Sequence, residues 1–255
     1  MTAVGELVRS WRQRRRLSQL DLAVAADVSS RHLSFIETGR SKPSSQMLIH
    51  LSEHLDIPLR ERNALLLAGG FAPAYPEHGL DAPPMAAVNE AIERVLAAHQ
   101  PYPAVVVDRH WEMVAANPAI GVLIEGCATH LLEPPVNVLR LSLHPDGMAP
   151  RIANLGAWRA HLLARLRRDV DSTGDAVLAE LLTELGSYLG GAAPEPPPTL
   201  VVPLIYRRGD TELAFFSTTT VFGTPLDVTV SELAIEAFYP EDETTAAALR
   251  ALPVR

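Results

Sequence analysis

Hydrogen-bonding and cationic side chains gather in one short stretch, residues 17–40, which reads LSQLDLAVAADVSSRHLSFIETGR. Apolar residues recur there at the spacing of two short helices, and the second helix leaves hydroxyl and guanidinium groups exposed. Such groups can hydrogen-bond to base edges in the major groove of DNA. The stretch is typical of a helix-turn-helix, in which the second helix enters the groove.

Start and stop signals set the limits of these two helices. Ser18, with Asp21 three residues later, predicts a capping box at the start of the first helix. Asp27 falls in the turn, where the backbone often needs a positive φ that Asp tolerates. Ser29 is a suitable N-cap for the second helix, and Gly39 is expected to end it.

The second helix has an inner and an outer face. Leu33 and Ile36 are predicted to anchor it, so that Ser30, Arg31 and Ser34 face outward. Arg31 is the best candidate for reading a base, because a guanidinium can bond to guanine O6 and N7 together. Phe35 either touches a thymine methyl group or packs against the following helix, and packing is favoured.

A run of cations precedes the motif. The apolar face formed by Val4, Leu7, Val8 and Trp11 predicts a helix, and its C-terminal end carries Arg12, Arg14, Arg15 and Arg16. The arginines are either a solvated helix end favoured by the helix dipole or phosphate contacts, and we favour phosphate contacts. Two further predicted helices, 44–55 and 59–68, complete an all-α five-helix bundle over residues 1–70.

The charge is unevenly distributed. The formal net charge is −8, yet residues 1–70 hold ten cationic and seven anionic side chains and the rest of the chain holds 12 and 23. The basic end is therefore the candidate DNA face, because the acidic remainder would repel nucleic acid.

Glycine and proline divide the 255-residue chain into two predicted domains. Glycines and prolines, which interrupt helices and strands, are concentrated over residues 69–84. This predicts a linker at 71–84 between a domain at 1–70 and a domain at 85–255. A second Gly- and Pro-rich stretch at 190–198 is interpreted as a stiff loop.

The second domain is predicted to be α+β. We expect strands near 104–107, 111–115, 200–207, 211–219 and 232–239, and helices near 85–98, 118–125, 137–143, 155–171 and 175–188. Pro203 would confine its strand to a sheet edge. Two strands, several helices and three more strands is the order of a PAS-like domain: one five-stranded antiparallel sheet with helices over its concave face.

A core or a cavity is expected between these helices and the sheet. On the residues alone, a closed and fully packed core is favoured over a cavity. The residues predicted to line it are Val106, Val114, Leu139, Leu143, Trp158, Leu162, Leu166, Leu178, Leu182, Phe216, Leu233 and Ile235. An acyl chain would need one polar anchor for its carboxylate, and the candidates are Arg140, His161 and Arg165.

The N-terminal region resembles the Xre/Cro/phage-repressor family of helix-turn-helix domains. The resemblance covers residues 4–69 and rests on Leu-Ser-Gln at 17–19, Ser29, Ile-Glu-Thr-Gly-Arg at 36–40 and Pro43. It implies that Gln19 contacts phosphate, that Arg12 and Glu37 form a structural ion pair, and that Arg40 and Lys42 hold the DNA backbone. The full predicted DNA-binding set is Arg12, Arg14, Ser18, Gln19, Ser29, Ser30, Arg31, Ser34, Arg40 and Lys42.

Residues 86–252 resemble the ligand-binding domain of MmyB-like transcription regulators. The resemblance rests on Asp-Arg-His-Trp at 108–111, Asn-Val-Leu-Arg-Leu-Ser-Leu-His-Pro at 137–145, Trp-Arg-Ala-His-Leu at 158–162 and Phe-Phe-Ser-Thr at 215–218. It implies a DNA-binding regulator whose PAS-like domain holds an apolar ligand, namely a fatty acid or acyl chain. The expected partners are a palindromic operator bound as a homodimer and a small apolar ligand; no cofactor is required. The alternative is a regulator whose second domain only dimerises or docks a protein.

Catalytic, metal and membrane motifs are not found in the sequence. There is no HExxH, no GxSxG and no dinucleotide or phosphate-binding glycine loop, so we expect neither an enzyme nor a metal centre. Cys127 is the only cysteine and is interpreted as a plain thiol. Residues 1–16 lack an apolar leader, and no apolar run is long enough for a bilayer, so we expect a cytoplasmic protein without membrane insertion.

Overall fold

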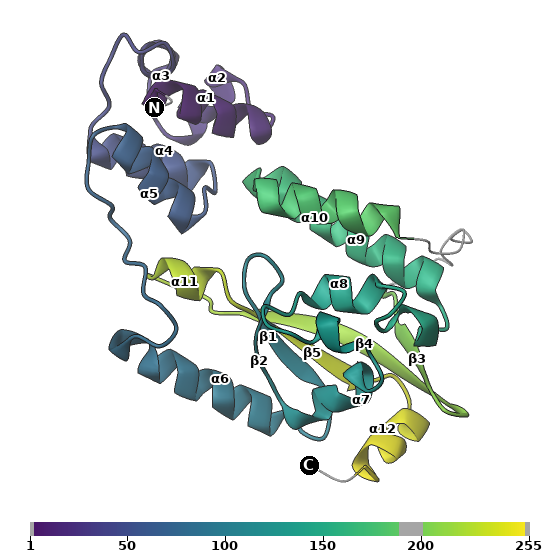
Figure 1. Ribbon diagram of the computed structural model, residues 1–255. Coiled ribbons are helices and arrows are strands. Elements are labelled where there is room, and N and C mark those ends of the chain that lie inside the picture. The colour runs from purple at the N-terminus through teal and green to yellow at the C-terminus, as the bar shows by residue number, and fades with distance from the viewer. Residues whose placement is uncertain (1–2, 189–200, 253–255) are drawn as a thin grey trace. The chain divides into compact units, whose positions relative to one another are not determined.

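The computed structural model describes residues 3–188 and 201–252. The chain divides into two compact units (Figure 1). The first comprises residues 1–79 with 171–174 and 224–231, and the second comprises 80–170, 175–223 and 232–255, within the described residues. The loop predicted at 190–198 lies outside them.

The first unit contains the predicted five-helix bundle. Its core is apolar and closed, with Leu22, Leu33 and Leu48 fully buried. Periodic leucines and alanines give each helix one face to bury, which is why short helices are stable here. The helices are α1 (Val4–Arg14), α2 (Gln19–Ala25), α3 (Ser30–Glu37), α4 (Ser45–His54) and α5 (Leu59–Ala68).

The predicted linker does not begin as a free segment. The side chain of Asn63 in α5 accepts hydrogen bonds from the N–H groups of Ala74 and Tyr75 and donates one to the Tyr75 carbonyl. Arg62 also donates to the Tyr75 hydroxyl. Residues up to 79 therefore belong to the first unit.

The second unit contains the predicted five-stranded antiparallel sheet. Its order is β2-β1-β5-β4-β3, and every neighbouring pair is antiparallel. The edge strand β3 begins directly after Pro203, which agrees with the predicted edge position. The likeness to PAS domains stays a prediction. The strands are β1 (Ala104–Val107), β2 (Met113–Ala116), β3 (Leu204–Arg208), β4 (Thr211–Val221) and β5 (Ala234–Pro240).

Helices in this part of the chain follow the prediction except in two places. Those that match are α6 (Ala86–Ala98), α7 (Gly121–Ile124), α8 (Val138–Leu143), α9 (Leu155–Thr173) and α10 (Ala176–Ser187). The short α11 (Val228–Ser231) and the C-terminal α12 (Glu243–Arg250) were not predicted. Asp242 caps α12 by accepting from the Thr245 N–H, a signal that the sequence did contain.

The inner strand β1 is buried on both faces of the sheet. Val105 and Val107 of β1 point into the large core with α8, α9 and α10, whereas Val106 points to a smaller core under α6. Figure 1 shows α6 on one side of the sheet and α8, α9 and α10 on the other. The alternation of side chains along a strand thus assigns each residue to one of two cores.

Two adjacent phenylalanines of β4 test this alternation. Phe215 is fully buried, whereas Phe216 is 37% exposed and stacks on Tyr239. We expect Phe215→Ala to lower the free energy of unfolding by about 3–5 kcal/mol, because it leaves a core cavity. We expect Phe216→Ala to cost about 1 kcal/mol or less. Urea unfolding of both variants measures the difference, and equal losses would contradict the assigned register.

Candidate DNA interface and ligand cavity

The helix-turn-helix is fixed by the predicted caps. The Ser18 hydroxyl accepts from the Asp21 N–H, and the Asp21 carboxylate accepts from the Ser18 N–H, so the capping box is confirmed. The Ser29 hydroxyl accepts from the His32 N–H at the start of α3. Asp27 in the turn has a φ of 50°, as predicted. These hydroxyls therefore hold helix ends.

A buried ion pair joins α1 to α3. The Arg12 guanidinium donates to both Glu37 carboxylate oxygens at 2.6 and 2.9 Å, and also to the Leu17 carbonyl. Gln19 donates to the same carboxylate at 2.8 Å. Burial alone would raise the pKa of Glu37, but the hydrogen bonds from Arg12 and Gln19 outweigh it, and the pKa lies below its ordinary value.

This ion pair corrects part of the predicted DNA-binding set. The Arg12 side chain is only 10% exposed and each of its three nitrogens donates a hydrogen bond within the protein, so its role in the bundle is structural. Gln19 is half-buried, with its amide directed to Glu37. The Arg12–Glu37 pairing itself agrees with the expectation.

The N-terminal part of α3 presents the predicted reading surface. Ser30 and Arg31 are exposed and Ser34 is partly exposed. Phe35 lies between two cations, with the Arg31 guanidinium carbon 5.3 Å and the Arg40 carbon 6.0 Å from its ring centroid. It is not among the residues packed against the bundle core, so the favoured interpretation of Phe35 as a packing residue is not supported. The ring instead orients two arginines.

The other cations predicted to contact DNA differ in their exposure and in their bonds within the protein. Arg40 and Lys42 are exposed in the loop after α3. Arg14 is half-buried, with its guanidinium carbon 4.9 Å from the Trp11 ring centroid. Arg15 donates to the carbonyls of Leu55 and Asp56 and so closes the end of α4. The run of arginines is thus partly structural.

A small apolar cavity lies between the sheet and the helices of the second unit. Its volume is about 70 Å³. Five of the predicted residues line it: Leu139, Trp158, His161, Leu162 and Arg165. Leu143, Leu166, Leu178 and Leu182 lie in or against the same core without lining the cavity.

The sheet residues predicted for the cavity are wrong. Val106, Val114, Leu233 and Ile235 belong to the core under α6, and Phe216 is partly exposed. The error is one of parity, because a shift of one residue along a strand moves a side chain to the opposite face. The sheet residues that line the cavity are Val105, Met113, Leu204, Ser217, Glu236 and Phe238.

One end of the cavity is polar. Arg165 from α9 donates to both Glu236 carboxylate oxygens at 2.9 and 2.6 Å and to the Thr219 hydroxyl at 2.9 Å. Its guanidinium carbon lies 4.4 Å from the Trp111 ring centroid. Glu236 was missed, although a single carboxylate in an otherwise apolar strand was a signal that a buried cation faces it.

The other two candidate anchors differ in position. His161 lines the cavity and stacks on Trp158, and burial together with Arg165 and Arg168 lowers its pKa. Its imidazole is therefore neutral at neutral pH. Arg140 does not line the cavity; it forms a two-bond ion pair with Glu184 of α10.

Cys127 lies outside the cavity. It accepts a hydrogen bond from the Arg151 guanidinium at 3.1 Å. Burial raises the pKa of its thiol despite this cation. The thiol is therefore protonated at neutral pH and a poor nucleophile.

Both parts of the chain match known protein families. Residues 8–62 match the family described as Helix-turn-helix, and residues 88–252 match the MmyB-like transcription regulator ligand binding domain. Both families are regulatory and are not enzyme families. No curated protein matches the chain. Within the described residues, every helix is too short or too polar to cross a bilayer. The chain belongs to the MmyB-like transcription regulators, with a helix-turn-helix domain ahead of its ligand-binding domain.

Proposed function

We propose that this regulator reads a specific operator with α3 and that an acyl compound in the second unit adjusts its DNA affinity. The observation that carries the DNA half is the exposed Arg31 at the N-terminal part of α3. The ligand-binding part of the proposal rests on the apolar cavity, whose lining includes the Arg165–Glu236 ion pair.

Recognition of DNA is supported by where the free cations lie. Arg31 is oriented by the Phe35 ring, and Arg40 and Lys42 are exposed beside the same helix. A guanidinium can bond to guanine bidentately, whereas an ammonium acts on phosphate as a point charge. We therefore assign base reading to Arg31 and backbone binding to Lys42.

Binding as a homodimer follows from the size of this surface. One α3 of eight residues reaches few base edges. A second copy related by two-fold symmetry would double the contacts on a palindromic operator. The half-site centres should then lie about 10 bp, or a multiple of it, apart.

Substitution of the two cations separates base from backbone binding. Arg31→Ala should cost about 1–3 kcal/mol of binding free energy on an operator selected from random DNA, and should relax sequence preference at one position. Lys42→Ala should weaken binding to all DNA alike and reduce the salt slope by about 1. Fluorescence anisotropy over a salt series measures both. Arg167→Ala, an exposed arginine of α9, is the control. Unchanged operator affinity in Arg31→Ala would contradict the assignment.

The size of the cavity sets how a ligand must enter. At about 70 Å³ it is smaller than the ~150 Å³ engineered cavity that accepts benzene. A chain of about a dozen methylenes gains on the order of 10 kcal/mol on burial, but only if α8 and α9 move away from the sheet. The ligand would therefore favour an expanded state over the closed one, which is the differential affinity that regulation requires.

Mass spectrometry of an organic extract of the purified chain tests the ligand half. We expect one acyl compound per chain, bound because the cavity lining is apolar. An extract free of such compounds, together with no melting shift on adding acyl compounds, would favour the alternative of a dimerisation or docking module. DNA binding by the first unit would be unaffected by that outcome.

The charges at the polar end favour a neutral head group over a free carboxylate. Both terminal nitrogens of the Arg165 guanidinium already donate to Glu236, whose side chain is 7% exposed. A fatty acid carboxylate there would face a second buried carboxylate. Esters, amides and alcohols can instead use the neutral His161 and the Ser217 hydroxyl, which also line the cavity.

Glu236→Gln should reverse this preference. The wild-type chain should bind dodecanol or methyl dodecanoate more tightly than dodecanoate, and Glu236→Gln should shift the ratio toward dodecanoate by about tenfold or more, since a charged hydrogen bond contributes about 1.5–3 kcal/mol. Isothermal titration calorimetry measures the ratio. Glu212→Gln removes an exposed ion pair with Arg207 and is the matched control. An unchanged ratio would contradict the role given to Glu236.

A further inference from the structure

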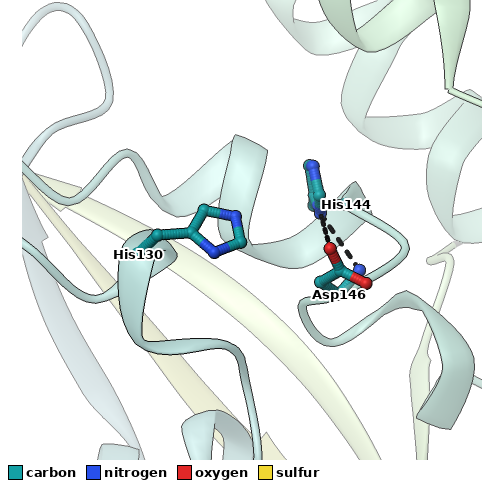
Figure 2. Close-up of side chains that lie close together, drawn as sticks. All are labelled: His130, His144 and Asp146. Atoms are coloured by element: carbon teal, nitrogen blue, oxygen red, sulfur yellow. Dashed lines mark hydrogen bonds and ion pairs between the residues drawn. The ribbon is translucent and has the colours of Figure 1, made fainter.

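Two histidines and an aspartate gather on the second unit, away from the cavity lining. His130, His144 and Asp146 each offer one ligand atom, and these atoms all lie within 4.8 Å of one another (Figure 2). His144 Nδ1 is 3.9 Å from the Asp146 carboxylate. The His130 ring meets the His144 ring edge-on, with centroids 5.7 Å apart.

The backbone holds these residues in place. His130 lies in a 3₁₀ turn (Thr129–Leu131), and His144 is the residue that ends α8. The Ala128 N–H donates to the Asp146 carbonyl at 2.9 Å, which joins the two loops. Gly147 closes the turn, because a Cβ there would lie 2.2 Å from the Leu141 carbonyl oxygen. The triad is therefore built on a defined turn.

The donor set has the chemistry of a borderline divalent metal ion. Two imidazole nitrogens and one carboxylate oxygen suit Zn²⁺ and its neighbours in the first transition row. His130 and Asp146 are exposed and His144 is partly exposed, so water can complete the coordination. The ligand atoms lie up to 4.8 Å apart, which is more than twice a Zn–N bond of about 2.1 Å. The side chains must therefore rotate toward one another to hold one ion.

One hydrogen bond competes with the metal. His144 Nδ1 accepts from the Asp146 N–H at 3.0 Å, and coordination through this nitrogen would replace that bond. The loss lowers affinity, so moderate binding is expected rather than the very tight binding of a closed structural site. The Tyr188 ring lies edge-on to the His144 ring, with centroids 5.2 Å apart.

We propose that His130, His144 and Asp146 form a binding site for a divalent transition-metal ion, with Zn²⁺ as the representative ion. The ion would fasten the loop at 128–132 to the end of α8. Leu139 and Leu141 of α8 line the cavity, so metal binding would also hold part of the cavity wall.

Calorimetric titration of Zn²⁺ into the chelator-treated full chain tests the site. We expect one equivalent to bind, and His130→Ala or His144→Ala to weaken that binding by at least about tenfold, since even an outer-shell substitution costs this much. Zn²⁺ should also raise the melting temperature of the wild type and not of these variants. His130 is exposed, so the metal-free variant should melt like the wild type.

A second histidine pair provides the control. His50 and His54 of α4 lie with ring centroids 4.7 Å apart and are the alternative site that the experiment must exclude. His54→Ala should retain the full equivalent and its affinity. Binding that survives in the His130→Ala, His144→Ala double variant, or that is lost in His54→Ala, would overturn the proposal. None of these substitutions changes a lining residue of the cavity, so the loss of the metal equivalent can be measured whether or not the chain binds an acyl compound.

Discussion

The second unit depends on a sheet that is covered on both faces. One face packs on α6 and the other on α8, α9 and α10. A strand such as β1 must then be apolar throughout, and all four of its residues are buried. This constraint places the cavity on one face only, and it places Glu236 and Arg165 together because a charge on that face needs a partner within the core.

The same constraint explains what the sequence could and could not predict. Caps and turns are local, so Ser18, Ser29 and Asp27 were assigned correctly to the helix-turn-helix. The sequence could not predict which β1 side chains face the cavity, because a run of apolar residues has no polar position to mark one face of the strand. Val106 was therefore placed in the cavity, whereas Val105 lines it. The cluster of His130, His144 and Asp146 joins residues from two separate turns, so no single sequence motif marks it.

Two buried arginine–glutamate pairs have different consequences in the two units. In the Arg12–Glu37 pair, Gln19 donates a further hydrogen bond to the Glu37 carboxylate. The pair joins helices within a closed core. In Arg165–Glu236 the pair borders a cavity and stays 21% exposed on the arginine side. A buried pair contributes little net stability but is costly to break. The first pair therefore preserves the geometry of the bundle, whereas the second places a buried carboxylate beside the cavity.

A cavity smaller than the proposed ligand is compatible with regulation and is not evidence against it. A ligand with equal affinity for two states shifts neither of them. A preformed slot that fitted an acyl chain without change would bind tightly and signal nothing. A ligand larger than the 70 Å³ cavity would bind only if the surrounding core repacks, so under the proposed function its binding would be coupled to a change in packing. Leucines of α8 and α9 belong to one core cluster, and close-packed cores repack between discrete alternatives and do not deform continuously.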